Sequence, residues 1–288
     1  MSKRVDCLCV FVYIHTHSSF IKPIIKLTMS TDNLLLQERH ALILARLLAD
    51  GRVLAPDLAG WLKVSEDTIR RDLRDLAAAG QCQKVYGGAL RLPPPPAPND
   101  GTLVQRRAHR AAGKSQLALA AVSLIQPGSL IFIDAGSTNL CIAAALPEMP
   151  LTVVTNAPLI AAALLERSQV ELILIGGRVE RGSGASLGTG ALRDIDMLRP
   201  DLFCLGACGV DGAAGVTAFR YEEAVFKRRV ADASKAVLVA VTADKLGTAA
   251  PYQVLAADRL AHLIIERDAD AAMAAAFSAR GTQVLRAQ

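Results

Sequence analysis

The sequence is poor in aromatic residues, contains no long apolar run and has no block of like charge. Tryptophan, tyrosine and phenylalanine make up 4% of its 288 residues, so alanine and leucine must fill the core, which favours many short helices. The apolar stretch 5–14 is interrupted by Asp6 and is too short to span a bilayer, so we expect no membrane segment. The net charge of +5 permits an acidic partner such as nucleic acid without requiring one.

The cysteine pattern argues against metal and disulfide chemistry. The cysteines lack the spacing to one another and to histidines that zinc sites use. Reduced, mostly buried thiols are typical of a cytoplasmic protein, so we expect that location, with no metal and no cofactor. The six cysteines are Cys7, Cys9, Cys82, Cys141, Cys204 and Cys208.

Two breaks in composition divide the chain. The run Pro-Pro-Pro-Pro-Ala-Pro at 93–98 favours stiff polyproline II and cannot join a helix or a sheet. It predicts a linker at 93–101 between a domain at 30–92 and a larger one at 102–288. Residues 1–28 faintly resemble a signal peptide but lack a cleavage site. We expect them to be a disordered extension or the product of a start set too far upstream of Met29.

Residues 65–74 predict the last helix of a helix-turn-helix. Ser65 is a suitable N-cap, and Ile69, Leu73 and Leu76 form one apolar stripe. Gly80 is placed to end the helix. Arginines that face outward are often only solvated, or paired with neighbours such as Asp72 and Asp75. The outward positions hold Thr68, Arg70, Arg71 and Arg74.

The flanking segments complete this pattern. Apolar spacing predicts one helix from Gln37 and a second across 54–62, with Pro56 in its first turn, and Trp61 is expected to pack among the helices. Three helices with a basic last helix are the minimum for a headpiece that enters the major groove. Residues 82–90 predict a two-stranded wing that carries Lys84 and Tyr86, although a plain turn would also explain its two glycines.

The larger domain alternates short apolar strands with alanine-rich helices. This pattern predicts a largely parallel sheet covered on both faces, with ligands at the carboxyl ends of the strands. The expected strands are 130–134, 151–155, 170–175, 202–207, 236–241 and 262–266, and the expected helices are 114–125, 138–146, 157–167, 189–198, 221–233 and 268–277.

Small polar residues follow four of these strands, at 134–139, 155–156, 175–178 and 206–212. Gly136 permits close approach, and Ser137 and Thr138 add hydroxyls to the free amides of a helix N-terminus, which suits a phosphate. Each loop alone is most often a turn, but together they predict a ligand pocket. Glu222 or Glu223 could accept from sugar hydroxyls, and Lys245 could reach a phosphate.

In these motifs and their order, the sequence resembles the DeoR family of bacterial sugar-responsive regulators. The resemblance of residues 39–90 rests on Val64-Ser65, the run Thr-Ile-Arg-Arg-Asp-Leu at 68–73, and Gly-Gly-Ala at 87–89. Residues 114–266 carry, in the family's order, Asp-x-Gly-Ser-Thr, Thr-Asn, Gly-Gly, Gly-x-Asp-Gly, Glu-Glu-x-x-x-Lys and Asp-Lys-x-Gly. The sequence departs from the family in several places: Tyr86 replaces a common histidine, Cys208 replaces a polar residue, Lys245 lacks preceding serines, and the linker is richer in proline.

The resemblance implies a fold class and two sets of site residues. The fold is α/β: an N-terminal winged helix-turn-helix domain, then a larger sensor domain whose mostly parallel sheet is similar to ribose-phosphate isomerases and CoA transferases. The expected operator contacts are Ser65, Thr68, Arg70, Arg71, Arg74, Lys84 and Tyr86. The expected effector contacts are Asp134, Gly136, Ser137, Thr138, Asn156, Gly176, Asp211, Glu222 and Lys245.

The implied function is a DNA-binding regulator of carbohydrate genes, more specifically a repressor relieved by a phosphorylated sugar. A homo-oligomer is expected, because one headpiece reads too few base pairs of double-stranded DNA. The alternative is a sugar-phosphate isomerase-like enzyme with a DNA-binding headpiece, since carboxylates and a lysine can transfer protons. The helix-turn-helix favours the regulator, without catalytic residues. A DNA-packaging protein would leave the pocket loops unexplained.

Overall fold

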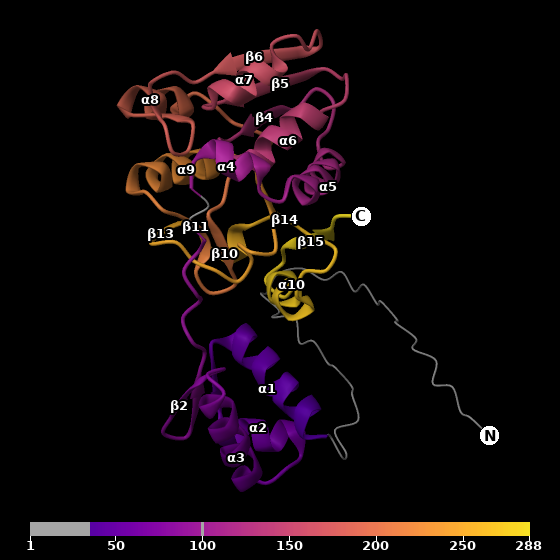
Figure 1. The fold of residues 1–288 in the computed structure, drawn as a ribbon, viewed down its shortest axis with the longest axis vertical. Coiled ribbons are helices and arrows are strands. Elements are labelled where there is room, and N and C mark those ends of the chain that lie inside the picture. The colour runs from indigo at the N-terminus through magenta and orange to yellow at the C-terminus, as the bar shows by residue number, and fades with distance from the viewer. Residues whose placement is uncertain (1–34, 99–100) are drawn as a thin grey trace, which may run out of the picture. The chain divides into compact units, whose positions relative to one another are not determined.

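The computed structural model of the protein describes residues 35–98 and 101–288 (Figure 1). The expectations for residues 1–28, with Cys7 and Cys9, lie outside this part of the chain. Within it, the segments 36–90 and 103–286 each hold their own hydrophobic core, and they are described in turn.

The first segment folds as a winged helix-turn-helix. Three helices pack through Ile43, Leu47, Leu62, Ile69 and Leu73, all nearly inaccessible to solvent. A small antiparallel sheet of order β1-β3-β2 completes the segment. The helices and the wing confirm the expectation from the sequence. The elements are α1 (Leu36–Asp50), β1 (Arg52–Leu54), α2 (Ala55–Leu62), α3 (Glu66–Ala78), β2 (Gln83–Val85) and β3 (Gly88–Leu90).

Strand β1 was not expected, and one glycine of the wing explains how it fits. A Cβ at Gly88 would collide with the carbonyl oxygen of Val53, so β3 can pair this closely with β1 only through glycine. Gly87 adopts a φ of +80° and makes the turn of the wing. The two neighbouring glycines therefore have different structural roles: Gly87 forms the turn, and Gly88 allows the close pairing of β3 with β1.

The expectation that Trp61 packs among the helices is wrong. Its side chain is 39% exposed, and the Arg46 guanidinium lies 5.9 Å from its ring centroid. The reason is the phase of α2, whose eight residues bury Ala55, Leu58 and Leu62. Trp61 falls outside that stripe.

The second segment is built on a seven-stranded sheet of order β15-β14-β12-β9-β4-β5-β6, in which every neighbouring pair is parallel. The mostly parallel sheet expected from the sequence is confirmed. The strands are β4 (Leu130–Ile133), β5 (Leu151–Thr155), β6 (Val170–Leu174), β9 (Leu202–Cys204), β12 (Ala236–Val241), β14 (His262–Ile265) and β15 (Gln283–Arg286).

Helices and short antiparallel strands complete this segment. β7 pairs with β8, and β10, β11 and β13 form a separate antiparallel sheet. The expected helices are all present, α9 with the expected ends and the others with shifted ends. Helix α4 was not expected, because it buries no side chain and so has no apolar stripe. These elements are α4 (Leu103–Ala108), α5 (Ala111–Val122), α6 (Ser137–Ala145), α7 (Pro158–Leu164), α8 (Thr189–Asp196), α9 (Tyr221–Ala233), α10 (Ala271–Ser278), β7 (Arg178–Glu180), β8 (Ala185–Leu187), β10 (Gly209–Asp211), β11 (Gly215–Ala218) and β13 (Tyr252–Leu255).

A cluster of three phenylalanines fixes α9 against the sheet. Phe132 on β4 and Phe203 on β9 meet edge to face with centroids 5.5 Å apart, and Phe226 on α9 lies 6.1 Å from Phe132. Aromatic pairs of this geometry add to the burial of their area. Because Phe226 is held there, the next residue, Lys227, is brought close to the sheet.

Among the described residues, no helix combines the length and apolarity needed to cross a membrane.

Candidate nucleic-acid interface and ligand pocket

Helix α3 presents a polar face and buries the opposite one. Ser65 caps the helix, its hydroxyl accepting from the Thr68 amide at 3.2 Å. Arg70 pairs with Glu66 at 2.8 Å across one turn, while within the described chain no ion pair engages Arg71 or Arg74, both exposed. The wing adds exposed Lys84 and a fully exposed Tyr86. Cationic side chains free to reach phosphates and base edges suit a DNA contact; the role of each expected residue stays a prediction.

Asp72 does not pair with the outward arginines, although the sequence left that pairing open as one of the alternatives. It is 1% exposed and accepts two hydrogen bonds from Arg39 on α1, Nε–Oδ2 at 2.6 Å and Nη2–Oδ1 at 2.9 Å. His40 Nε2 lies 3.3 Å from Oδ1. Asp72 is three residues after Ile69 and so shares the buried side of α3. The Asp72 carboxylate therefore joins α3 to α1 and does not pair with the arginines on the exposed face of α3.

A small polar pocket lies where several strands of the parallel sheet end. Its volume is about 40 Å³. Its walls come from the loops after β4 and β9, the end of β12 with the loop that follows, the turn between β7 and β8, and the helices α4, α6 and α9. This is the edge at which the sequence predicts a ligand. The polar lining residues are Arg106, Ser137, Thr138, Asn139, Ser183, Glu223, Lys227, Thr242 and Lys245, with Cys208 beside them.

A buried ion pair forms the base of this pocket. Lys227 Nζ lies 3.2 Å from Asp134 Oδ2 and donates to the Gly206 carbonyl at 2.7 Å. The Gly206 amide in turn donates to Asp134 Oδ2 at 3.0 Å. Burial alone would lower the pKa of Lys227, but Asp134, Cys208 and Glu223 outweigh it and the pKa is raised. Lys227 is thus a fixed cation held beneath the pocket and not a proton acceptor.

The expected effector residues divide into two groups. Gly136, Ser137, Thr138 and Lys245 line the pocket. Asp134 lies beneath it, wholly buried. The other expected residues lie elsewhere: Asn156 donates to the Ser186 carbonyl at 3.4 Å, Gly176 is exposed, Asp211 pairs with Arg91, and Glu222 pairs with Arg178 at 3.0 Å on the surface.

Glu223 replaces its neighbour Glu222 as the acidic residue of the pocket. The sequence left the choice between the two open, and Glu222 was preferred. Glu223, Phe226, Lys227 and Val230 recur at helical spacing and are all buried. That periodicity was readable from the sequence, and it would have placed Glu223 and Lys227 on the inner face of α9. Arg106 could not be found this way, because α4 has no buried stripe.

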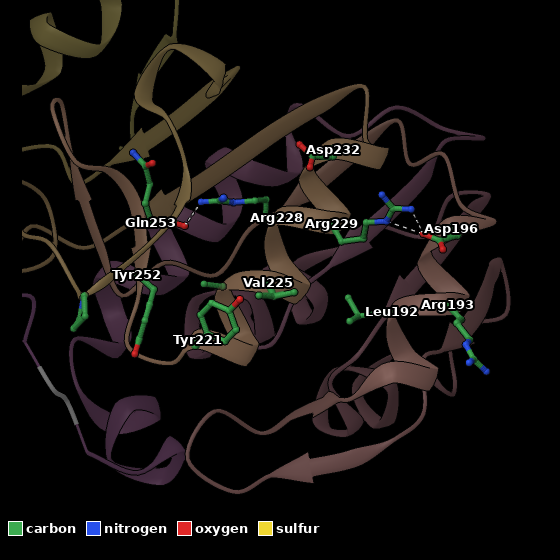
Figure 2. Close-up of a pocket in the computed structure, with 12 residues that line it drawn as sticks. Leu192, Arg193, Asp196, Tyr221, Val225, Arg228, Arg229, Asp232, Tyr252 and Gln253 are labelled. Carbon is green, nitrogen blue, oxygen red and sulfur yellow. Dashed lines mark hydrogen bonds and ion pairs between the residues drawn. The ribbon is translucent and has the colours of Figure 1, made fainter.

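A second hollow, larger and of different character, lies on the outer face of α8 and α9 (Figure 2). Its volume is about 600 Å³, and Tyr221 and Tyr252 meet edge to face at 5.8 Å beside it. Arg228 is engaged with the Gln253 carbonyl at 2.6 Å, and Arg229 with Asp196. The hollow contains none of the expected effector residues, and two of its three arginines already have partners. The small polar pocket is therefore the better candidate for an anionic ligand.

The thiols and acids of the described residues show no metal site. In the ranges 35–98 and 101–288, no three side chains of the histidine, cysteine, aspartate and glutamate types cluster closely enough to hold an ion. Cys82, Cys141, Cys204 and Cys208 are free. Burial raises the pKa of Cys204 to about 12, which keeps this thiol protonated and unreactive.

Comparison with known proteins identifies both segments. Residues 39–93 match the pattern described as a DeoR-like helix-turn-helix domain, and residues 109–267 match the DeoR C terminal sensor domain. The chain is 29% identical to the putative aga operon transcriptional repressor of Escherichia coli O157:H7, covering 86% of this chain and 93% of that protein. It is 31% identical to the glycerol-3-phosphate regulon repressor of Escherichia coli K12, covering 73% and 82%.

Among solved structures, ribose 5-phosphate isomerase A from Neisseria gonorrhoeae is similar at 18% identity, with a TM-score of 0.33 over 48% of this chain and 53% of that one. A likeness this low supports no conclusion about function.

Proposed function

Since the chain belongs to the DeoR family of transcriptional regulators, we propose that it is a DNA-binding repressor of carbohydrate-metabolism genes, released from its operator by a phosphorylated sugar. The observation that carries the proposal is the pairing, in one chain, of an exposed cationic helix with an enclosed polar pocket at the strand ends. A homo-oligomer acting in the cytoplasm is part of the proposal.

On the DNA side, α3 enters the major groove and the wing follows the backbone. Arg71 and Arg74 are exposed and supply guanidinium donors for guanine edges or phosphates. Lys84 and Tyr86 on the wing contact phosphates, which fix the register without reading sequence. Ile69 and Leu73 hold α3 to the core beneath these contacts.

On the effector side, the phosphate occupies the N-terminal end of α6. Ser137 and Thr138 begin this nine-residue helix and both line the pocket, so their amides and hydroxyls face an anion. Lys245 adds a cation from the loop after β12, and the Glu223 carboxylate accepts from the sugar hydroxyls. One acid opposite several cations selects a ligand with both an anionic and a hydroxylated end.

Release from DNA follows from linkage between the two sites. An effector that binds better to the arrangement with low operator affinity shifts the population to that arrangement. The same coupling free energy must weaken effector binding when the protein is held on DNA. Measurement of both affinities therefore tests the mechanism in two independent directions.

The decisive experiment is an electrophoretic mobility shift on DNA from the protein's own gene neighbourhood, with and without a panel of sugar phosphates. The expected result is a specific complex that one compound releases. As a matched pair, Glu223→Gln loses the response to that compound, whereas Glu222→Gln retains it. A complex that no compound releases would contradict the effector assignment, and a complete lack of specific binding would contradict the repressor itself.

The alternative is an isomerase-like enzyme that carries a DNA-binding headpiece. Its base would be Glu223 or Lys245, which both line the pocket, because Lys227 is held protonated by Asp134. The relatives reported above are named as transcriptional repressors, which favours a protein without turnover. Conversion of ribose 5-phosphate by the purified protein would reverse this preference.

A further inference from the structure

The enclosed part of the pocket is small. Its volume of about 40 Å³ holds only a few water molecules, each of which needs roughly 10–15 Å³ on the same measure. A sugar phosphate is larger than that, so a wall that can move would allow more of such a ligand to be enclosed.

Of the helices that line the pocket, α4 is the least buried. Its six residues bury no side chain, while α6 and α9 bury several each. Elements with few buried contacts open most readily. The turn after α4 contains Arg110, which adopts a φ of +51°, a conformation that a side chain makes unfavourable. A change of conformation at this turn would relieve the strain and move α4.

Polar contacts hold α4 in place, and one of them comes from a residue of the pocket wall. Arg106 Nη2 donates to the Gly182 carbonyl at 2.7 Å. Lys114 Nζ, on α5, holds the carbonyl of Arg106 and that of His109, the latter at 2.6 Å. A phosphate in the pocket would compete with the Gly182 carbonyl for the Arg106 guanidinium, because a charged acceptor is stronger than a neutral one.

The Arg106 side chain also has a hydrogen-bond donor that no described residue accepts from. Its Nε is buried and has no hydrogen-bond partner among the described residues, and the side chain lines the pocket together with Ser137, Thr138 and Lys245. A buried donor without a partner is unfavourable, so a ligand oxygen that accepts from it is favoured. The planar guanidinium can offer Nε and one Nη to two oxygens of a phosphate at once.

We propose that Arg106 is a phosphate-binding residue of the effector pocket and that α4, with the turn through Arg110, is a lid that moves when the phosphate binds. This inference rests on the proposed function and adds to it a residue and a moving element. Arg106 leaves the Gly182 carbonyl for the phosphate, and α4 moves with it. The contacts that remain, from Lys114 to two carbonyls and from Arg110 to Glu266 and Asp244, lie at the C-terminal end of the helix, about which it can turn.

The position of α4 in the chain gives this motion a consequence. The linker is attached near the same pocket: Ala97 donates to the Ala249 carbonyl at 2.8 Å, and the Ala249 amide donates to the Pro95 carbonyl at 3.0 Å. Ala249 lies four residues after Lys245 on one loop. The ligand would therefore contact both the loop that holds the linker and the helix that follows it. The lid is thus placed to alter how the linker is held.

The test compares the full-length protein with Arg106→Ala, Arg106→Lys and the control Arg107→Ala. Arg107 is the next residue on α4, is exposed and does not line the pocket, so its loss removes the same charge. Inorganic phosphate is the probe, titrated by calorimetry at constant ionic strength. Hydrogen exchange over residues 103–110 is followed with and without phosphate.

We expect wild type and Arg107→Ala to bind phosphate alike, and Arg106→Ala to bind at least about tenfold more weakly. Arg106→Lys falls between them, because it keeps the charge but loses the two-point geometry. Exchange over 103–110 changes with phosphate in wild type and the control, but not in Arg106→Ala. Circular dichroism and thermal unfolding check that the variants fold. If Arg106→Ala does not fold, the proposal is tested by Arg106→Lys, which should bind phosphate more weakly than wild type.

Two outcomes would overturn the proposal and are distinct from failure of the pocket itself. If both Arg106 variants bind phosphate as wild type does, Arg106 is not a ligand. If exchange over 103–110 is unchanged at saturating phosphate, α4 is not a lid. If wild type binds no phosphate at all, the phosphate-binding pocket fails, and this inference fails with it.

Discussion

The α3 face and the sensor pocket hold their functional side chains in opposite ways. On α3, Arg71 and Arg74 are exposed and the helix is fixed by the residues beneath them. In the pocket, Glu223 and Lys227 are buried and belong to the core packing of α9. A surface that meets a large partner can separate recognition from stability, whereas a site that encloses a small ligand cannot. Substitutions should therefore affect binding alone on the exposed face of α3, but folding as well in the pocket.

The largest effect is expected at the buried pair beneath the pocket. Lys227→Met leaves the wholly buried Asp134 without its cation, which should lower the free energy of unfolding by about 3–5 kcal/mol. The control is Lys235→Met, which breaks a lysine–aspartate pair at the surface, Lys235–Asp201, and should cost under about 1 kcal/mol. Urea unfolding measures both. Equal costs would show that burial does not distinguish the two pairs.

A smaller loss is expected at the corresponding pair of the headpiece. Asp72→Ala removes the partner of Arg39, whose side chain is 13% exposed and can reach water. We expect a loss of about 2–3 kcal/mol together with loss of operator binding, because α3 is no longer joined to α1. Asp75→Ala, at an exposed position of the same helix, is the control and should retain both. Unfolding curves and mobility shifts give the two readouts, and an Asp72→Ala protein that unfolds like wild type would remove the structural role.

Recognition by α3 should respond without any change in stability. Arg71→Ala is expected to weaken operator binding by about 1–3 kcal/mol while the unfolding midpoint stays unchanged, since Arg71 is exposed. Arg181→Ala removes an exposed charge from the turn after β7 and should leave operator affinity close to that of wild type. Fluorescence anisotropy at fixed salt measures the affinities. Equal losses in both variants would mean that only net charge matters.

Acidification should reveal a contribution from Asp211. Burial alone would raise the pKa of this carboxyl, but hydrogen bonds from Arg91 and from the amides of Ala214 and Ala213 outweigh it, and the pKa is lowered. The folded-state pKa then lies below the unfolded value of about 3.9. The stabilisation is present above that value and is lost as the pH falls through the folded-state pKa.

Asp211→Asn should accordingly lower stability at pH 7 by on the order of 1–2 kcal/mol and flatten the dependence of stability on pH below about 5. The exposed Asp258→Asn serves as the control and should keep the slope of wild type. Thermal unfolding across pH 3–7 measures the slopes. A wild-type slope in Asp211→Asn would assign the acid sensitivity to other carboxylates.

The smallest effect is expected one residue away from the pocket. Glu222 and Arg178 are 65% and 71% exposed in their side chains, and solvent-exposed pairs contribute at most about 1 kcal/mol. Glu222→Gln should therefore change the unfolding free energy by less than about 0.5 kcal/mol. A loss as large as that of Lys227→Met would contradict the assignment of Glu222 to the surface.

Much of the fold could be predicted from the sequence, because apolar periodicity reports burial directly. The recognition helix, its Ser65 cap and the exact span of α9 follow from such patterns. The strands that were missed have the opposite character. β15 is an edge strand with exposed ends, and β10 and β11 are rich in small residues. None of these three strands therefore has a strong apolar pattern in the sequence.

The sequence by itself determined the two-part architecture, the cationic face of α3 and the edge of the sheet where polar loops gather. These depend on the order and spacing of residue types within one element, which the chain carries locally. Only the tertiary structure decided that Asp72 binds Arg39, that Glu223 enters the pocket while Glu222 stays outside, and that Arg106 on α4 lines the same pocket as Ser137. These contacts join residues far apart in the chain, so packing of whole elements against one another fixes which side chains meet.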